Sequence, residues 1–151
     1  MEHLVYCDAK AKVLEKLIAG EKTMIVRGAA GRKLPHGRVF AGEKLYFIEN
    51  NGDGLVKATA TVKTVFNSEK MTPEESIQKI EELQSKLNLS KAQFDRWAGK
   101  KVLCLIEVTD VQAIEPLKFE RQKNMDDWIT VESIEDILEG ADKKYNSIRV
   151  K

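Results

Sequence analysis

A predicted antiparallel hairpin is the strongest constraint on the fold of this chain. Two stretches, 44–49 and 55–66, flank the turn sequence Asn50-Asn51-Gly52-Asp53-Gly54. Asn-Gly and Asp-Gly pairs tolerate positive φ and are typical of tight hairpin turns. In the second stretch apolar residues alternate with lysine and threonine, which is the period of a strand with one wet face. Ala58 and Ala60 are small enough to allow close packing inside a barrel.

Helix signals occur on both sides of this hairpin. Asp8 is suited to cap a helix at 9–19, and Gly20 suits its left-handed end. Thr72-Pro73-Glu74-Glu75 combines a capping box with proline at the first helical position. Ser90 opens a second capping box before a short helix. The pattern predicts three helices.

Two further segments are predicted as strands. Residues 22–28 favour an extended, packed backbone. Residues 102–108 are a continuous apolar run, typical of a central strand, which we expect to continue to Glu115, where Pro116 ends ladder pairing. The order of elements predicts an α+β fold, a small and partly closed barrel with helices over its ends or mouth.

Charge is distributed unevenly although the net charge is only +1. Between residues 22 and 44 there are six basic residues and one acid, Glu43, together with His36. The basic residues are Lys22, Arg27, Arg32, Lys33, Arg38 and Lys44. Residues 124–151 carry seven acids and four bases, and within them Met125–Trp128 and Thr130–Leu138 are predicted as capped helical turns. The basic segment is a candidate binding surface for phosphate.

Length and composition exclude several classes of protein. A chain of 151 residues fits one domain, so we expect a single domain over 1–151. No apolar run reaches the length of a membrane-spanning helix, and we expect a cytoplasmic protein that does not contact membranes. Cys7 and Cys104 lie among apolar neighbours without metal-ligand spacing, which predicts buried thiols and neither a metal nor a cofactor.

One motif resembles a known family. Residues Gly20 to Arg27 resemble the Gly-x-Lys-x-x-Glu-x-Arg signature of ASCH domains, a branch of the PUA-like superfamily, at three of its four positions. The order of the basic loop, the hairpin, the helix that opens with Met71-Thr72-Pro73 and the late apolar strand also matches. The resemblance implies a mixed, mainly antiparallel PUA-like barrel of about five or six strands. It also implies a cleft that binds RNA or a modified nucleoside.

The departure from the signature concerns catalysis. Ile25 stands where the signature has glutamate, or where family amidohydrolases acting on acetylated cytidine have threonine, and an isobutyl group has neither a nucleophile nor a proton to transfer. Lys22 and Glu69 align with the other two catalytic positions of those enzymes. Thr23 lies on the same strand face as Ile25 and is the alternative nucleophile. We therefore lean against an enzyme, and Glu69 has the alternative of capping the following helix.

The first functional prediction is an RNA- or nucleotide-binding module without a cofactor. Its predicted ligand-binding residues are Lys22, Arg27, Arg32, Lys33, Arg38 and Trp128. The alternative for the arginines is a solvated loop paired with the C-terminal acids, and for Trp128 it is packing in the core. Other candidate functions are a hydrolase of a modified nucleoside or of RNA through Lys22 and Glu69, and a protein-interaction adaptor through the acidic C-terminal helices.

Overall fold

Six strands dominate the fold. The structure, a computed structural model, describes residues 1–120 and 127–138. The strands of these residues are β1 (Glu2–Cys7), β2 (Met24–Ala29), β3 (Lys44–Glu49), β4 (Leu55–Asn67), β5 (Val102–Lys118) and β6 (Trp128–Val131). The helices are α1 (Val13–Ile18), α2 (Pro73–Glu82), α3 (Gln84–Leu87), α4 (Lys91–Trp97) and the 3-10 helix η1 (Ile134–Ile137). None of the described helices is both long and apolar enough to span a membrane.

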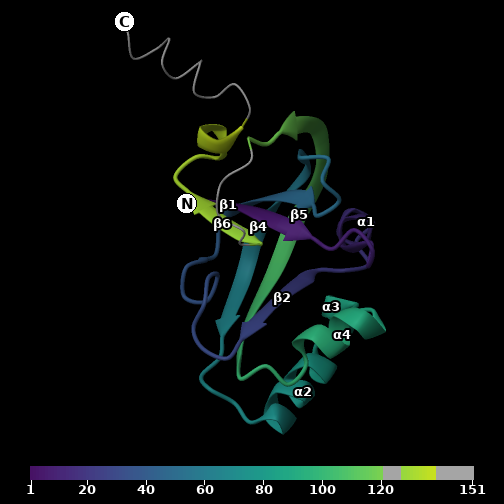
Figure 1. Ribbon diagram of the computed structural model, residues 1–151, viewed down its shortest axis with the longest axis vertical. Helices are drawn as coiled ribbons and strands as arrows, with labels where there is room; N and C mark the ends of the chain where they lie inside the picture. The colour runs from purple at the N-terminus through teal and green to yellow at the C-terminus, as the bar shows by residue number, and fades with distance from the viewer. Residues whose placement is uncertain (121–126, 139–151) are drawn as a thin grey trace, which may run out of the picture.

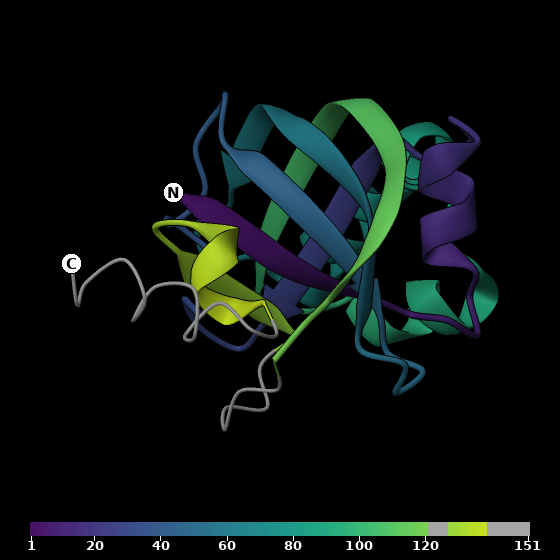
Figure 2. The same ribbon diagram turned by 90° about the horizontal axis from the view of Figure 1, so that it is seen from above.

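The strands form one mixed sheet in the order β2-β5-β4-β3-β1-β6. Strands β1 and β3 pair in parallel, and the other neighbours pair antiparallel. The sheet curls into a half-barrel, which is seen from above in Figure 2. This confirms the predicted small barrel of about six mainly antiparallel strands.

The predicted hairpin is confirmed as strands β3 and β4. Lys44 pairs with Thr61 and Phe47 with Ala58, so the alternation in β4 places small side chains inside the barrel. Ala58 and Ala60 are almost fully buried in the inner core, together with Phe47 and Trp128. The inner core thus comes from the apolar face that the sequence pattern predicted.

Helices α2, α3 and α4 cover the outer face of β2 and β5 (Figure 1). Met24 and Val26 of β2 point toward these helices and pack with Ile80 and Trp97. Ile25, between them, faces the inner core. The alternation in β2 therefore directs Ile25 and Arg27 away from the helices and toward the inside of the half-barrel.

Both predicted N-cap residues, Thr72 and Ser90, lie at helix starts, but only Thr72 forms a capping box, because the Gln93 side chain bonds to Asp8 and Trp97 instead of the Ser90 backbone. The Thr72 hydroxyl accepts from the Glu75 backbone N–H at 3.2 Å, and the Glu75 carboxylate accepts from the Thr72 N–H at 3.0 Å. The Ser90 hydroxyl accepts from the Gln93 N–H at 3.2 Å and begins α4. These local signals placed α2 and α4 correctly.

The first helix is shorter than the predicted 9–19. The Asp8 carboxylate accepts from the N–H groups of Lys10 and Ala11, which makes a turn rather than a helix start. Lys12 then has a left-handed φ of 56°, and α1 begins at Val13. Gly20 has the predicted left-handed conformation, with φ 78°.

Two predictions about the C-terminal half are wrong. Pro116 does not end the pairing of β5, because Leu117 and Lys118 still pair with β4 beyond a register shift. Since three residues of β5 lie opposite one residue of β4 there, Pro116 needs no ladder hydrogen bond. The predicted helical turns Thr130–Leu138 are reduced to η1, because β6 continues to Val131; of the predicted turn Met125–Trp128, residues 125 and 126 lie outside the described residues, and Trp128 begins β6. Residues 121–126 and 139–151 lie outside the described residues.

Candidate functional site

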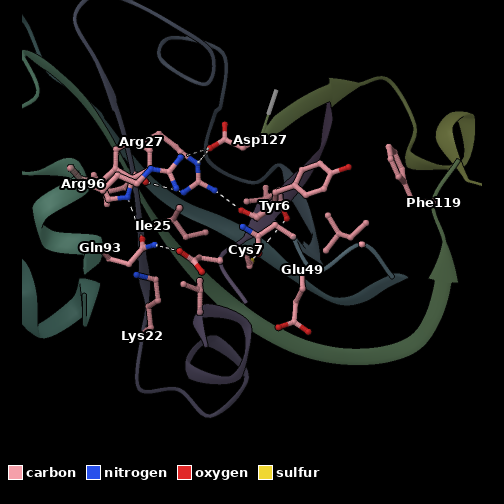
Figure 3. A pocket seen from close by; sticks show the side chains of 18 of the residues that line it. Tyr6, Cys7, Lys22, Ile25, Arg27, Glu49, Gln93, Arg96, Phe119 and Asp127 are labelled. Atoms are coloured by element: carbon pink, nitrogen blue, oxygen red, sulfur yellow. Dashed lines mark hydrogen bonds and ion pairs between the residues drawn. The ribbon is translucent and has the colours of Figure 1, made fainter. Parts of the chain in front are cut away.

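A large pocket opens between the two edges of the half-barrel, and its volume is about 710 Å³. It is lined by parts of β1 and β2, the β3–β4 turn, α4, the end of β5 and Asp127 (Figure 3). Its polar lining includes the side chains of Asp8, Lys22, Arg27, Glu49, Gln93 and Arg96. A volume of this size lies within the range of pockets that bind small molecules. We refer to this cavity as the large pocket.

Lys22 lies at one end of the large pocket and is 3% exposed. Its ammonium donates to the carbonyl of Leu87, at the end of α3. Burial, with the nearby cations Arg27 and Lys16, lowers the pKa of Lys22 to about 7. Lys22 is therefore an amine that changes its charge near neutral pH inside the pocket.

Arg27 fills the gap between the edge strand β2 and strand β1. Its Nη2 donates to the Tyr6 carbonyl at 2.7 Å and its Nη1 to the Val26 carbonyl at 2.9 Å. The guanidinium carbon lies 5.7 Å from the ring centre of Trp128 and 5.8 Å from that of Trp97. These contacts hold the guanidinium in one orientation, since carbonyls and aromatic faces both favour a planar cation.

The Nε atom of Arg27 is buried and faces the carboxylate of Asp127. It lies 3.2 Å from Asp127 Oδ2, which makes an ion pair. The same Nε has no hydrogen-bond partner among the described residues, since an ion pair needs only proximity whereas a hydrogen bond needs alignment. Burial lowers the pKa of Arg27, opposed by Asp127, but guanidinium stays protonated in proteins. Arg27 is a fixed cation whose position is set by two backbone carbonyls and Asp127.

Helix α4 supplies a second cation and an amide. The guanidinium carbon of Arg96 lies 4.4 Å from the ring centre of Trp97, and its Nη2 lies 3.9 Å from Asp127 Oδ2. The Gln93 amide donates to Asp8 Oδ2 at 2.7 Å and accepts from the Trp97 indole at 3.3 Å. Gln93 and Asp8 thus form an ordered polar pair on the wall, of the kind that matches a base edge.

The floor of the large pocket is apolar. Ile25 and Cys7 are each 2% exposed and belong to the inner core. Burial raises the pKa of both Cys7 and Cys104 to about 12, so these thiols are not reactive thiolates near neutral pH. The described residues contain no group of three or more His, Cys, Asp or Glu arranged to hold a metal ion.

A small pocket of about 330 Å³ lies on the other side of Arg27. It is lined by the end of β2, the following loop with Lys33 and His36, the residues after α4 with Lys100, and the start of β5. Four residues line both pockets, and we call them the shared wall: Arg27, Arg96, Trp97 and Asp127. One set of cations thus borders two adjacent cavities.

The two pockets differ in charge. The large pocket is lined by four basic residues, Lys22, Arg27, Arg96 and Lys118, and four acids, Asp8, Glu49, Glu120 and Asp127. Among residues 1–120 and 127–138, the small pocket is lined by four basic residues, Arg27, Lys33, Arg96 and Lys100, and by one acid, Asp127. A balanced, partly apolar pocket favours a base or nucleoside, whereas an excess of cations favours phosphate.

The predicted binding residues do not all come together. Lys22 and Arg27 line the large pocket, and Lys33 lines the small one. Arg32 points outward and pairs with Glu69 at 3.1 Å, with side chains 68% and 88% exposed. Arg38 is exposed and lines neither pocket. The predicted alternative, pairing of arginines with C-terminal acids, is found at Arg27, whose partner is Asp127.

Trp128 and Glu69 lie away from the cavity of the large pocket. The Trp128 ring is 0% exposed and its indole donates to His3 Nδ1 at 3.1 Å, so it offers no free face to a ligand. Trp128 is therefore not a ligand contact, and it packs beside Arg27 instead. Glu69 lines neither pocket, and the structure does not bring it together with Lys22.

Polar residues of the site that were not predicted from the sequence include Asp8, Glu49, Gln93, Arg96, Lys100 and Asp127. A usable signal existed in α4, because Gln93, Arg96 and Trp97 have the spacing of one helix face. Asp127 carried no such signal, since its contact with Arg27 joins opposite ends of the chain. Sequence proximity to a predicted aromatic, Trp128, was its only indication.

Comparison with known proteins identifies the fold. The crystal structure of an ASCH protein from Zymomonas mobilis matches with a TM-score of 0.65 and 13% identity, covering 97% of this chain and 94% of that chain. Two mutants of that protein match with TM-scores of 0.66 and 13% identity, covering 97% of this chain and 97% and 95% of theirs. No family model and no curated protein matches the sequence. The chain has an ASCH-like fold, as its signature residues predicted.

Proposed function

We propose that this chain is an RNA- or nucleotide-binding module that holds one nucleotide unit in the large pocket. The observation that carries the proposal is the position of Arg27 and Arg96, two guanidinium groups on aromatic faces, at the wall of a pocket of about 710 Å³. Guanidinium groups bind phosphate oxygens with two hydrogen bonds at once. Arg27 and Arg96 both line the large pocket, and a phosphate there would compete with Asp127 for them.

The remaining lining suits a nucleoside. Ile25 and the other apolar residues of the floor offer surface for a ring, and the Gln93 amide with Asp8 offers hydrogen-bonding groups at its edge. Base recognition in single strands uses this combination of apolar contact and polar edges. The ASCH-like fold supports the proposal by analogy alone, so the weight rests on the pocket.

Titration followed by NMR tests this function. The four ribonucleoside monophosphates and a short single-stranded RNA are added to the 15N-labelled chain at low salt. We expect chemical-shift changes at Arg27, Gly28, Gln93 and Arg96, and weaker binding as salt rises, because cation–phosphate contacts release counterions. If no ligand shifts resonances around the large pocket at low salt, the proposed function is wrong.

A second candidate, hydrolysis of a modified nucleoside, is favoured by one observation. Lys22, with a pKa of about 7 and 3% exposure, is an amine able to exchange a proton inside the pocket. Its carboxylate partner would be Glu49, which lines the same pocket, and not Glu69. Acetylcytidine turnover by the wild type and by Lys22→Ala tests this candidate. An absence of turnover, or turnover that the substitution leaves unchanged, excludes it.

A further inference from the structure

We propose that the small pocket is a second phosphate-binding site, which takes the phosphate next to the nucleotide held in the large pocket. The inference rests on the proposed function and extends it from one nucleotide unit to a ligand with at least two phosphate groups. The shared chemistry is a phosphate carried either by a free nucleotide or by the next linkage of an RNA chain. Both sources meet the same basic cavity of about 330 Å³.

The small pocket carries an excess of positive charge. Lys33 and Lys100 add two ammonium groups to the guanidinium groups of the shared wall, and Asp127 is the one acid among the described residues of its lining. Among residues 1–120 and 127–138, no carboxylate forms an ion pair with Lys33 or Lys100. Cations that converge on a cavity without carboxylate partners are typical of a site for a polyanion.

The backbone of the small pocket is built to hold Lys100 in place. A Cβ on Gly28 would lie 3.0 Å from Lys100 Cβ and 3.0 Å from Leu103 Cδ2, so glycine lets Lys100 lie close against strand β2 without a shift. Gly31, in the loop that follows, has open space where its Cβ would be. The strand end is therefore closely packed on one side and open toward the cavity on the other.

The loop that carries Lys33 is anchored at two points. His36 Nε2 donates to the Ser68 carbonyl at 2.9 Å, which places the ring hydrogen on that nitrogen. The backbone N–H of Gly37 donates to Asn67 Oδ1 at 3.0 Å. Both contacts tie the loop to the end of β4, so the ammonium of Lys33 is delivered to the cavity by an ordered backbone.

The shared wall connects this site to the large pocket. Arg27 and Arg96 line both cavities, so a phosphate bound to them lies at the boundary. A ligand with its base in the large pocket and one phosphate at this boundary has its next phosphate directed into the small pocket. The balanced charge of the large pocket and the positive charge of the small pocket favour this orientation over the reverse.

The test compares ligands with one and two phosphates. Ribonucleoside 3′-monophosphates, the matching 3′,5′-bisphosphates and the matching diribonucleotides with a 5′-phosphate are titrated by calorimetry into the full chain. A charge-assisted contact contributes about tenfold in affinity, so we expect two-phosphate ligands to bind at least about tenfold tighter than monophosphates. Tighter binding of the bisphosphates alone assigns the site to free nucleotides, and tighter binding of the diribonucleotides assigns it to RNA.

A double variant, Lys33→Gln with Lys100→Gln, separates this inference from the proposed function. It should abolish the gain from the second phosphate, while monophosphate affinity falls no further than in a matched control that also loses two positive charges. The matched control is Arg38→Gln with Lys101→Gln, which removes two exposed charges of the same segments that line neither pocket. Equal affinities for one and two phosphates in the wild type overturn the second site while the nucleotide pocket stands. If neither kind of ligand binds, the proposed function itself fails.

Discussion

Arg27 and Asp127 form an ion pair, with 3.2 Å between Nε and Oδ2, that links opposite edges of the sheet. Arg27 belongs to the edge strand β2, and Asp127 directly precedes the other edge strand, β6. Because Arg27 also donates to the Tyr6 carbonyl of β1, one side chain both closes the half-barrel and presents a cation to the pockets. Arg27 therefore contributes both to the contact between the sheet edges and to the proposed binding of phosphate.

Substitution of Arg27→Lys should weaken both functions. A lysine keeps the charge but loses the planar set of donors that now serves the Tyr6 and Val26 carbonyls. We expect mononucleotide affinity to fall by at least about tenfold and the free energy of unfolding to fall by about 1 to 3 kcal/mol. Calorimetric titration and urea denaturation measure the two effects.

The matched control for this prediction is Arg32→Lys. Arg32 is exposed and its ion pair with Glu69 is exposed as well, so the exchange should change the free energy of unfolding by less than about 0.5 kcal/mol. It should also leave affinity unchanged, since Arg32 lines neither pocket. Equal effects of the two exchanges would contradict a special role for Arg27.

Substitution of Asp127→Asn should strengthen phosphate binding. The Asp127 carboxylate competes with the ligand for Arg27 and Arg96, at 3.2 and 3.9 Å. Its removal leaves the cations of the shared wall free, and we expect roughly three- to tenfold tighter binding of monophosphates, by Coulomb attraction near a protein surface. The unphosphorylated nucleosides serve as the control ligands and should bind with unchanged affinity. A parallel change for nucleosides would place Asp127 at the base and not at the phosphate.

Substitution of Gly28→Ala tests the packing of the small pocket. The added methyl group would lie 3.0 Å from both Lys100 Cβ and Leu103 Cδ2, so one of them must move. Overpacking of this kind costs about 1 to 3 kcal/mol in the free energy of unfolding and shifts Lys100 or Leu103 slightly. Gly31→Ala, where the methyl group meets open space, is the control and should have no such cost. Thermal denaturation compares the stabilities of the two variants. Equal stabilities would show that Lys100 or Leu103 moves without a measurable cost, which would contradict close packing at Gly28.

Local sequence signals predicted the elements that depend on neighbouring residues. The turn Asn50–Gly54, the capping box at Thr72 and the N-cap Ser90 act within a few residues, so the hairpin and helices α2 and α4 follow from the sequence. Strand β1 was missed because its pairing is entirely long-range, in parallel with β3 and antiparallel with β6. Without β1 and β6 in view, the sequence could not place Asp127 beside Arg27.

The candidate site was predictable only in part for a similar reason. The alternation of β2 correctly directs Ile25 and Arg27 to the inside, and Lys22 precedes the same strand. The loop after β2 has no such regular period, so the sequence could not show that Lys33 lines a cavity while Arg32 and Arg38 face outward. Composition identified a basic segment, but the fold divides it between two pockets and the surface.

The pH dependence of stability should carry the signature of Lys22. Its pKa is about 7 in the folded chain and about 10.4 in an unfolded one, so the unfolded state binds more protons between these values. The contribution of Lys22 to the free energy of unfolding therefore rises with pH across this window, because folding releases the Lys22 proton and that release costs less as pH rises. In Lys22→Met the buried charge is absent, and this contribution to the pH dependence disappears.

Urea denaturation of the wild type and Lys22→Met at several pH values between 6 and 10.5 measures the difference. Because one pKa unit corresponds to about 1.4 kcal/mol, we expect the wild type to gain on the order of several kcal/mol relative to the variant as pH rises through the window. Lys10→Met, at an exposed position, is the control and should follow the wild type. Parallel curves for the wild type and Lys22→Met would mean that Lys22 keeps its ordinary pKa, which would also remove the amine on which the hydrolase candidate depends.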